Sequence, residues 1–414
     1  MDEVCFLHCA DLHLGARPLG LEARFDDFGN AFERIVDHAL ESEVRFVLIS
    51  GDFFHQRSIN AATLGQALHA LDRLRERSVP VYAIEGNHDA ALYVDGESWM
   101  GFLNRQGYLR LLRPDADAAG SYLSEYDGAS GCIAYAHGVR IVGLGYYFSA
   151  SAKRMEQLAG QLPEYAGRTV LMLHSGVDRL LWQDANALSS SALSAFAGKV
   201  DYFALGHIHT RYEIPGGFYN PGAPEWVHID EMKRANAEKG FYFVRISDGG
   251  AAAEFIPSTP RPVLFIDIQA QGNAGQSALE ELAVENVKEA MDAHGLAPVV
   301  QIGIGTQEDT LLFDTQAVAR AVESRCGAIK AEVWIKSGEN EARESGEGED
   351  GVPIERMALE ELIAEELPGA DMEEACGFVL GLRDALDAGT DPSVITGSLE
   401  EMVNKVWGEQ INVG

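Results

Sequence analysis

Five short polar clusters in the first half of the chain carry the side chains that divalent metal ions bind in proteins. In chain order they are Asp11-Leu12-His13, Gly51-Asp52-Phe53-Phe54-His55, Gly86-Asn87-His88-Asp89, His174-Ser175-Gly176 and Gly206-His207-Ile208-His209. Carboxylate and amide oxygens combined with imidazole nitrogens form mixed sites for ions such as Mn²⁺, Fe²⁺ and Zn²⁺. The glycines directly before Asp52, Asn87 and His207 let the backbone turn sharply and approach a ligand closely. If the clusters meet in the fold, they form a divalent metal site.

No cluster is decisive alone. A single histidine beside a strand is more often a core or surface residue than a ligand. Asp-x-His and His-x-His pairs arise by chance, and a glycine followed by Asp or Asn commonly marks a turn. The metal-site hypothesis therefore depends on five clusters that follow one another in a fixed order.

The elements that position these clusters are short apolar strands that alternate with amphipathic helices. Strands are predicted at residues 4–7, 46–49, 79–84, 140–144, 169–173 and 202–205, and helices at 28–42 and 62–77. This alternation indicates a layered α/β domain. All the predicted strands except the one at 140–144 are followed by a polar cluster. Ligands bind at the carboxyl ends of strands in open α/β sheets, so we expect the clusters to converge there.

In this order, the motifs DLH, GDxxH, GNHD, an isolated histidine and GHxH resemble the calcineurin-like metallophosphoesterase superfamily. The resemblance implies an α/β fold of four layers, a β-sandwich flanked by helices, and a two-metal phosphoesterase site. It also implies the ligands by motif: Asp11, His13 and His209 for one metal, Asn87, His174 and His207 for the other, and Asp52 bridging both.

The same resemblance assigns a catalytic role to His88, which would stabilise the transition state or protonate the leaving oxygen. Two cations about 3.5–4 Å apart can hold the attacking and leaving oxygens of an in-line phosphoryl displacement. Asp89 would orient His88, or would be a turn residue.

A finer resemblance, to the SbcD family of DNA repair nucleases, covers residues 1–262. It is carried by Phe6 to Gly15, Arg24 to Phe28, His55 in GDFFH, Phe218 to Ala223, Lys239-Gly240-Phe241 and Thr259 to Pro262. It implies a manganese-dependent 3′-to-5′ exonuclease that also cuts single strands or hairpins, with His55 close to the DNA. It further implies a homodimer and an SMC-like ATPase partner of the SbcC type. Residues 61–74 and 98–103 are suggested as the dimer contacts.

Four regions follow from changes in composition. Residues 1–260 are expected to form the phosphoesterase (nuclease) domain, and a proline-rich stretch ends it. Residues 261–337 are expected to form a small α+β domain, to which the resemblance gives a DNA-capping role. Its strands are predicted at 263–268, 299–305, 310–313 and 329–335, and its helices at 275–294 and 316–326.

The two remaining regions are an acidic flexible linker at 338–352 and a helical segment at 353–414. The apolar stripe of such a segment needs a partner, and the resemblance makes the ATPase that partner. A self-contained helical subdomain or a homodimer element is the alternative.

The charge is unusual for a protein that binds DNA. The formal net charge is −32, and residues 261–414 carry 10 basic and 31 acidic residues, a net charge of −21. Charge alone therefore disfavours nucleic acid as a ligand, because a polyanion is repelled except where basic residues or metals gather. The candidate phosphate contacts are Arg17, Arg57, Lys153, Arg154, Arg179 and Arg211.

Composition also bears on the location of the protein. No apolar run reaches the ~18–20 residues that cross a bilayer, and the acidic start does not resemble a signal peptide. The five cysteines are scattered and form no CxxC pair. We expect a reduced, cytoplasmic protein without a membrane partner.

Two rival functions share these residues. One is a metallophosphodiesterase that acts on a small molecule or nucleotide. Such an enzyme needs neither a capping domain nor a docking segment, which counts against it. The other is a non-catalytic scaffold with a structural metal site, for which His55 and His88 are unnecessary.

Overall fold

The computed structural model describes residues 2–90, 96–114, 122–146, 152–177, 188, 193–229, 231, 238–270, 275–291, 296–306 and 313–336. The predicted linker at 338–352 and the predicted helical segment at 353–414 lie outside the described residues. Their assignment, like the domain boundaries, stays a prediction.

The first sheet has six strands in the order β12-β11-β1-β2-β3-β4. The four strands from β1 to β4 run parallel, β11 is antiparallel to β1, and β12 is antiparallel to β11. Their bounds are β1 Val4–Cys9, β2 Phe46–Ser50, β3 Val81–Ile84, β4 Arg110–Leu111, β11 Gly240–Ser247 and β12 Gly250–Pro257. The carboxyl ends of β1, β2 and β3 therefore lie at one edge of this sheet.

The second sheet also has six strands, in the order β5-β6-β7-β8-β10-β9. The strands β6, β7, β8 and β10 run parallel, and β5 and β9 are antiparallel to their neighbours. Their bounds are β5 Ile133–Ala136, β6 Val139–Leu144, β7 Arg168–His174, β8 Tyr202–Gly206, β9 Tyr212–Ile214 and β10 Phe218–Asn220.

The two sheets pack face to face and enclose an apolar core. Residues such as Phe6 and Leu48 of the first sheet meet Ile141 and Met172 of the second. The ring of Phe6 lies edge-on to Tyr202 across this interface, with centroids 5.6 Å apart. Such aromatic pairs add to the stabilisation from apolar burial.

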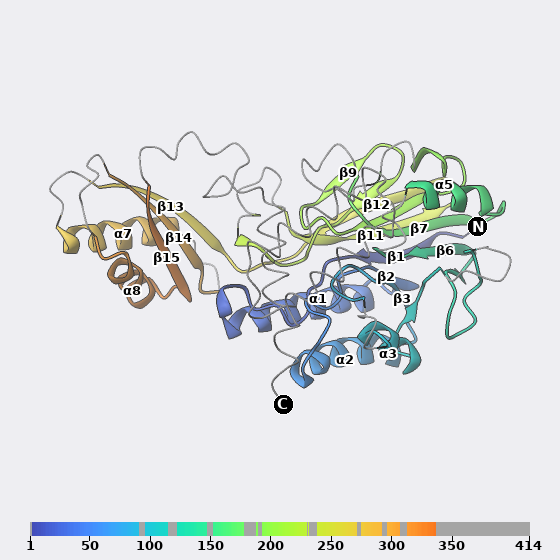
Figure 1. Ribbon diagram of the computed structural model, residues 1–414, viewed down its shortest axis with the longest axis horizontal. Coiled ribbons are helices and arrows are strands. Elements are labelled where there is room, and N and C mark those ends of the chain that lie inside the picture. Colours follow the sequence, from blue (N-terminus) through green and yellow to red (C-terminus); the bar gives the residue numbers. More distant parts are fainter. Residues whose placement is uncertain are drawn as a thin grey trace, which may run out of the picture. The chain divides into compact units, whose positions relative to one another are not determined.

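Helices cover the outer faces of both sheets (Figure 1). The first sheet packs against α1 Glu22–Glu41, α2 Ala61–Glu76 and α3 Trp99–Arg105, and the second against α5 Ala152–Gln161. A short 3₁₀ turn, η1 Pro18–Gly20, precedes α1. This arrangement confirms the predicted four-layer α/β sandwich. Among the described helices, none is both long and apolar enough to cross a bilayer.

Helix α1 begins at Glu22, six residues before the predicted start at residue 28. The added turns are amphipathic because Phe25 packs its ring inward and Arg24 and Asp27 are buried in ion pairs. A periodicity count scores charged residues as exposed, so it places the start of the helix too late. Helix α2 begins at Ala61, one residue before its predicted start, and Asn60 caps it by accepting a hydrogen bond from Thr63 N at 2.9 Å.

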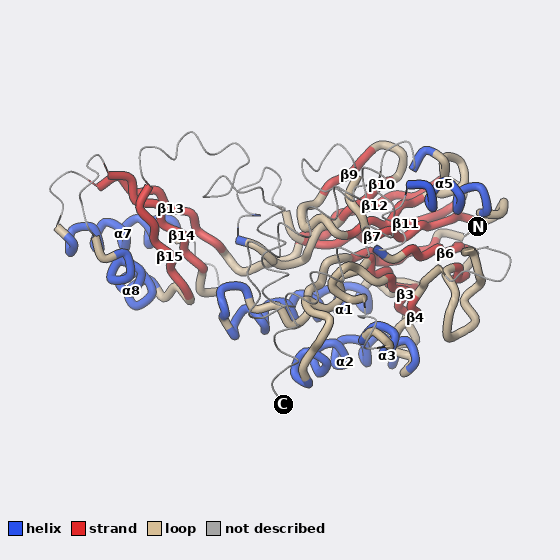
Figure 2. Tube along the Cα trace, in the orientation of Figure 1, coloured by secondary structure: helices blue, strands red, loops and turns tan. Residues whose placement is uncertain are grey.

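Residues 263–336 contain a three-stranded sheet in the order β13-β14-β15 together with two helices (Figure 2). The elements are β13 Val263–Ala270, α7 Gln276–Ala290, β14 Val299–Thr306, α8 Thr315–Cys326 and β15 Lys330–Lys336. They match the predicted α+β content. Most of the short strand predicted at 310–313 lies outside the described residues, and Phe313 is in a loop.

Candidate metal centre

The five polar clusters meet at the carboxyl edges of the two sheets. Asp11 follows β1, Asp52 follows β2 and Asn87 follows β3, while His174 ends β7 and His207 follows β8. Parallel pairing within each sheet and face-to-face packing of the sheets bring these strand ends together. Four of the predicted ligands adopt positive φ, with values of 52° at Asp11, 44° at His13, 49° at Asp52 and 90° at His207. Strained backbone of this kind concentrates at functional sites.

One group of side chains contains Asp11, His13, Asp52 and His209, whose ligand atoms all lie within 4.8 Å of one another. The two imidazole Nε2 atoms of His13 and His209 are 3.0 Å apart. The Oδ2 atom of Asp52 lies 3.8 Å from His13 Nε2. This group has the composition predicted for the first metal.

A second group contains Asp52, His174 and His207. His174 Nε2 lies 3.2 Å from Asp52 Oδ2 and 3.3 Å from the amide oxygen of Asn87. The same Asn87 oxygen lies 3.2 Å from His207 Nδ1. Asp52 is thus common to both groups, as a bridging ligand would be. The structure brings all seven predicted ligand residues together.

The electrostatics of these groups fit a bound cation. Burial and the nearby Asp52 carboxylate raise the pKa of Asp11 to about 7, although His174 opposes this shift. Burial alone would also raise the pKa of Asp52, but His174 and other imidazoles hold it well below its usual range. Two carboxylates buried side by side repel each other when both are ionised, and divalent cations between them remove that penalty.

Imidazole chemistry leads to the same result. Burial, reinforced by His209, lowers the pKa of His13 well below its usual value. A neutral imidazole offers a lone pair, which is the form that binds a metal. His174 differs, since Asp52 raises its pKa to about 9 against the effect of burial. A cation beside Asp52 would compete with that proton. The residues present therefore fit two divalent metals.

His88 and His55 lie beside the first group. His88 Nδ1 donates to the His55 carbonyl oxygen at 2.8 Å, and the two rings stack with centroids 5.6 Å apart. The backbone N–H of His88 donates to Asp52 Oδ1 at 3.0 Å. Burial and neighbouring His88 lower the pKa of His55 to about 4. No described residue forms a hydrogen bond with His88 Nε2, and the ring is fixed by contacts on its other side.

Asp89 has the contacts of a loop-fixing residue. Its carboxylate is buried and accepts hydrogen bonds from the backbone N–H groups of Phe53 at 3.1 Å, Phe54 at 2.9 Å and Gly86 at 3.0 Å. Burial and the neighbouring Asp52 raise its pKa to about 7. The expected bond from Asp89 to the His88 ring is replaced by the His55 carbonyl. Asp89 therefore joins the loops after β2 and β3, in keeping with the turn-residue alternative.

The candidate phosphate contacts separate into three kinds. Arg57 donates to the Asn87 carbonyl oxygen at 3.4 Å. Arg17 lines a cavity of about 250 Å³ together with His55, but it is ion-paired with Glu22 at 2.9 Å. Arg211 is paired with Glu213 at 2.8 Å and with Glu238, so its charge is already matched. Arg179 lies outside the described residues, as do the side chains of Lys153 and Arg154.

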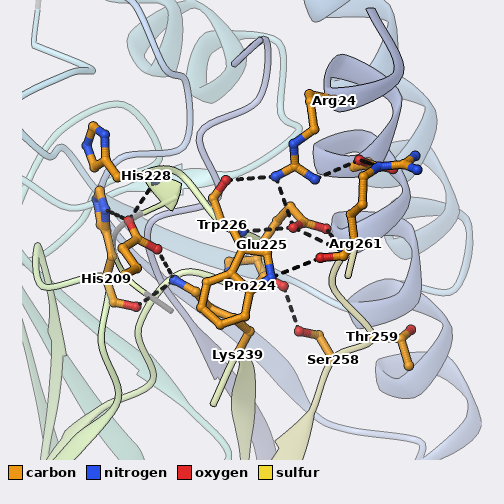
Figure 3. A network of polar contacts seen from close by, with 12 residues as sticks. Arg24, His209, Pro224, Glu225, Trp226, His228, Lys239, Ser258, Thr259 and Arg261 are labelled. Atoms are coloured by element: carbon orange, nitrogen blue, oxygen red, sulfur yellow. Dashed lines mark hydrogen bonds and ion pairs between the residues drawn. The ribbon is translucent and has the colours of Figure 1, made fainter. Parts of the chain in front are cut away.

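Two residues absent from the predicted site support it from behind. Glu231 accepts a hydrogen bond from His209 Nδ1 at 2.8 Å and is ion-paired with buried Lys239. His209 and Lys239 are labelled in Figure 3. Burial alone would raise the pKa of Glu231, but His209 and Lys239 hold it well below its usual range. The His228 ring stacks on the His209 ring, with centroids 5.6 Å apart. In the sequence, Lys239 was noticed only as part of the Lys239-Gly240-Phe241 motif, to which the resemblance assigned no function.

Comparison with known proteins agrees with this geometry. Residues 6–211 match the sequence profile of the family described as Calcineurin-like phosphoesterase. This part of the chain is a calcineurin-like phosphoesterase domain. The matched residues include all seven predicted ligands, because the last of them is His209.

The chain is also similar to curated DNA double-strand break repair proteins named Mre11. It is 27% identical over 378 residues to that of Aeropyrum pernix, which covers 86% of this chain and 87% of the relative. It is 26% identical over 403 residues to that of Methanopyrus kandleri, which covers 90% of this chain and 86% of the relative. The predicted resemblance to a repair nuclease family is thereby confirmed.

Proposed function

We propose that this chain is a two-metal-dependent DNA nuclease of double-strand break repair. The observation that carries the proposal is the arrangement of seven ligand-type side chains in two groups that share Asp52. The relatives named as DNA double-strand break repair proteins support DNA as the substrate. Hydrolysis of a phosphodiester is the reaction that such a site serves.

Bound at this site, two divalent cations supply positive charge to the phosphate oxygens and lower the pKa of an attacking water. The protein side chains hold that arrangement. Asp52 is oriented by the backbone N–H of His88, and Asp11 by that of His207, whose nitrogen lies 3.0 Å and 3.1 Å from the two carboxylate oxygens. Because these donors fix both carboxylates, the ligands need little rearrangement on binding.

His88 is proposed to hold a proton at the leaving oxygen. Its Nδ1 is committed to the His55 carbonyl oxygen, so Nε2 is the atom that can donate or accept. The His55 ring lies nearly parallel to that of His88, at an interplanar angle of 11°, and limits its rotation. A positioned general acid contributes about 10²–10⁴-fold to such reactions.

DNA binding is proposed to depend on few basic residues. Arg57 lies beside the site, whereas the charges of Arg17 and Arg211 are matched by acidic partners. The chain as a whole is strongly acidic, with a net charge of −32. We therefore propose that a partner supplies much of the attraction for the duplex.

The finer features come from the family resemblance. They are manganese as the metal, 3′-to-5′ exonuclease and single-strand or hairpin endonuclease activity, a cytoplasmic location, and a homodimer through α2 and α3. An SMC-like ATPase of the SbcC type would dock on residues 353–414, and residues 261–337 would cap the DNA.

The test is Mn²⁺-dependent degradation of end-labelled linear duplex and hairpin DNA by the full chain, alone and with a candidate SMC-type ATPase. His88→Ala is expected to lower cleavage by about 10²–10⁴-fold. His137→Asn is the matched control, because His137 is exposed and its φ of 50° is one that asparagine tolerates. It should cleave like the wild type.

Two results would favour the rivals. Hydrolysis of a chromogenic bis-phosphodiester without any DNA cleavage, under both conditions, would indicate an enzyme for small substrates. Binding of two metal ions without hydrolysis of either substrate would indicate a scaffold.

A further inference from the structure

We propose that Glu231 and Lys239 are positioning residues that hold His209 in the orientation and tautomer required for metal binding. This inference rests on the proposed metal centre. Glu231 Oε1 accepts from His209 Nδ1 at 2.8 Å, and Glu231 Oε2 is bonded to Lys239 Nζ. Lys239 Nζ also donates to the His209 carbonyl oxygen at 3.0 Å. One ion pair therefore holds both the ring and the backbone of the same residue.

The pair is buried, which is unusual for these residue types. Glu231 is 6% exposed and Lys239 is 3% exposed. Removing two charges from water costs about as much as their attraction returns, so a buried ion pair adds little net stability. The Lys239 ammonium also lies 4.7 Å from the centre of the Trp226 ring. Stability alone gives no reason for an ion pair at this position, whereas its two bonds to His209 do.

The pair determines which nitrogen of His209 can bind a cation. An ionised carboxylate only accepts hydrogen bonds, so Glu231 requires the proton on His209 Nδ1. The lone pair is then on Nε2, the atom that lies 3.0 Å from His13 Nε2 within the first ligand group. Without Glu231 the ring can adopt the other tautomer, in which an N–H occupies the ligand position. Carboxylate partners of this kind fix the tautomer of metal-binding histidines.

Lys239 keeps Glu231 in place for that task. The same Glu231 oxygen that binds His209 also accepts the backbone N–H of His228 at 3.0 Å. Lys239 binds the second oxygen and thereby fixes the plane of the carboxylate. The result is a rigid acceptor aimed at His209 Nδ1.

A neighbouring buried cluster offers a matched control. Glu225 is 1% exposed, accepts from Arg24 at 3.1 Å, and accepts from the backbone N–H of Trp226 at 2.8 Å (Figure 3). Like Glu231 it pairs with a buried cation and a loop backbone, yet none of its contacts involves His209. Glu225→Gln should therefore disturb the fold as much as Glu231→Gln without a specific effect on the metal ligand.

The experiment compares the full-length wild type, Glu231→Gln and Glu225→Gln in Mn²⁺ titrations followed by the electron paramagnetic resonance signal of free Mn²⁺. Glu231→Gln is expected to lower the affinity for one of the two Mn²⁺ ions by about 10–100-fold and to leave the affinity for the other unchanged. Glu225→Gln should keep both affinities at the wild-type values, even if its unfolding midpoint falls.

A second measurement uses metal-free protein labelled with ¹⁵N in its histidines. The His209 ring should carry its proton on Nδ1 in the wild type and in Glu225→Gln, and should show a mixture of tautomers in Glu231→Gln. If Glu231→Gln does not fold, Glu231→Asp replaces it, since the shorter carboxylate is withdrawn from the ring. Wild-type Mn²⁺ affinities together with an unchanged tautomer would overturn the proposal.

Neither measurement requires a substrate. A protein that binds Mn²⁺ as described but does not cleave DNA would contradict the proposed function and leave this inference intact. Conversely, normal DNA cleavage by Glu231→Gln with unchanged Mn²⁺ binding would contradict the inference alone.

Discussion

Gly86 has no space for a side chain, and the reason lies in the shared carboxylate of the metal centre. A Cβ atom at Gly86 would lie 2.0 Å from Asp52 Oδ1 and 2.5 Å from Asp52 N. Contacts below about 3 Å do not occur for real carbon atoms, so Gly86→Ala must displace the carboxylate by about 1 Å. Because the nitrogen of Asp52 is backbone, rotation of its side chain cannot relieve the whole overlap.

Two magnitudes follow from that displacement. Overpacking of a buried position costs about 1–3 kcal/mol of unfolding free energy. A misplacement of about 1 Å at a reacting centre costs about 100-fold in rate. Metal–ligand distances tolerate only about ±0.2 Å, so both ions that share Asp52 should bind more weakly. The protein should therefore remain folded and lose its metal-dependent activity.

The matched control is Gly160→Ala near the end of α5, where a Cβ atom meets nothing within 4 Å. This substitution should leave activity unchanged and stabilise the fold by about 0.4–1 kcal/mol, because alanine restricts the unfolded chain. The assays are urea unfolding and Mn²⁺-dependent hydrolysis of a chromogenic bis-phosphodiester. If Gly86→Ala hydrolyses this substrate at the wild-type rate, the assigned role of Asp52 is wrong.

Three further outcomes are expected. Asp89→Asn should lower the free energy of unfolding, measured in urea, by about 1–3 kcal/mol, since an amide cannot accept from all three backbone N–H groups. The control is Asp127→Asn, which should change the free energy of unfolding little because one oxygen of Asp127 accepts both of its backbone hydrogen bonds. Burial lowers the pKa of His8 to about 3, so its contribution to stability is complete above pH ~6.5 and is lost as the pH falls towards 3. His8→Gln should reduce the pH dependence of unfolding by about 1.4 kcal/mol per pH unit in that range, and an unchanged slope contradicts this. Mn²⁺ at about 100 times its Kd should raise the free energy of unfolding by about 2.7 kcal/mol per site, and a chelator should reverse the gain. If neither Mn²⁺ nor the chelator changes the midpoint of thermal unfolding, the metal centre is contradicted.

The central strands were predictable because they are buried on both faces. β1, β2, β3, β6, β7 and β8 are continuous apolar runs, and their observed bounds differ from the predicted ones by two residues or fewer. β11 was not predicted although its run Phe241 to Val244 is apolar and buried. Four other unpredicted strands have weaker local signals. β4 has two residues, β9 and β10 have three each, and β12 begins with the sequence GAAA. Their conformation depends on pairing with a neighbouring strand.

The convergence of the candidate ligands was predictable for a similar reason, since each of their segments lies at or just after a strand end. The contacts behind the ligands were not. Asp89 bonds backbone groups 35 and 36 residues earlier in the chain, and Glu231 bonds a histidine 22 residues before it. Such pairs have no fixed spacing in sequence, because the length of the intervening loop sets their separation.

Lys239 supports the candidate site from the start of a strand, whereas the predicted ligands all lie at or after strand ends. It immediately precedes β11, which is antiparallel to β1 with His8 opposite Tyr242. Two antiparallel strands place the start of one beside the end of the other, so the residue before β11 lies next to Asp11, which follows β1. A lysine there brings a positive charge to the edge where the carboxylates gather, and Asp11 is among the charges that act on it. The residues just before antiparallel partners of the central strands are therefore as close to the site as the residues just after the parallel strands, and supporting groups should be sought at both.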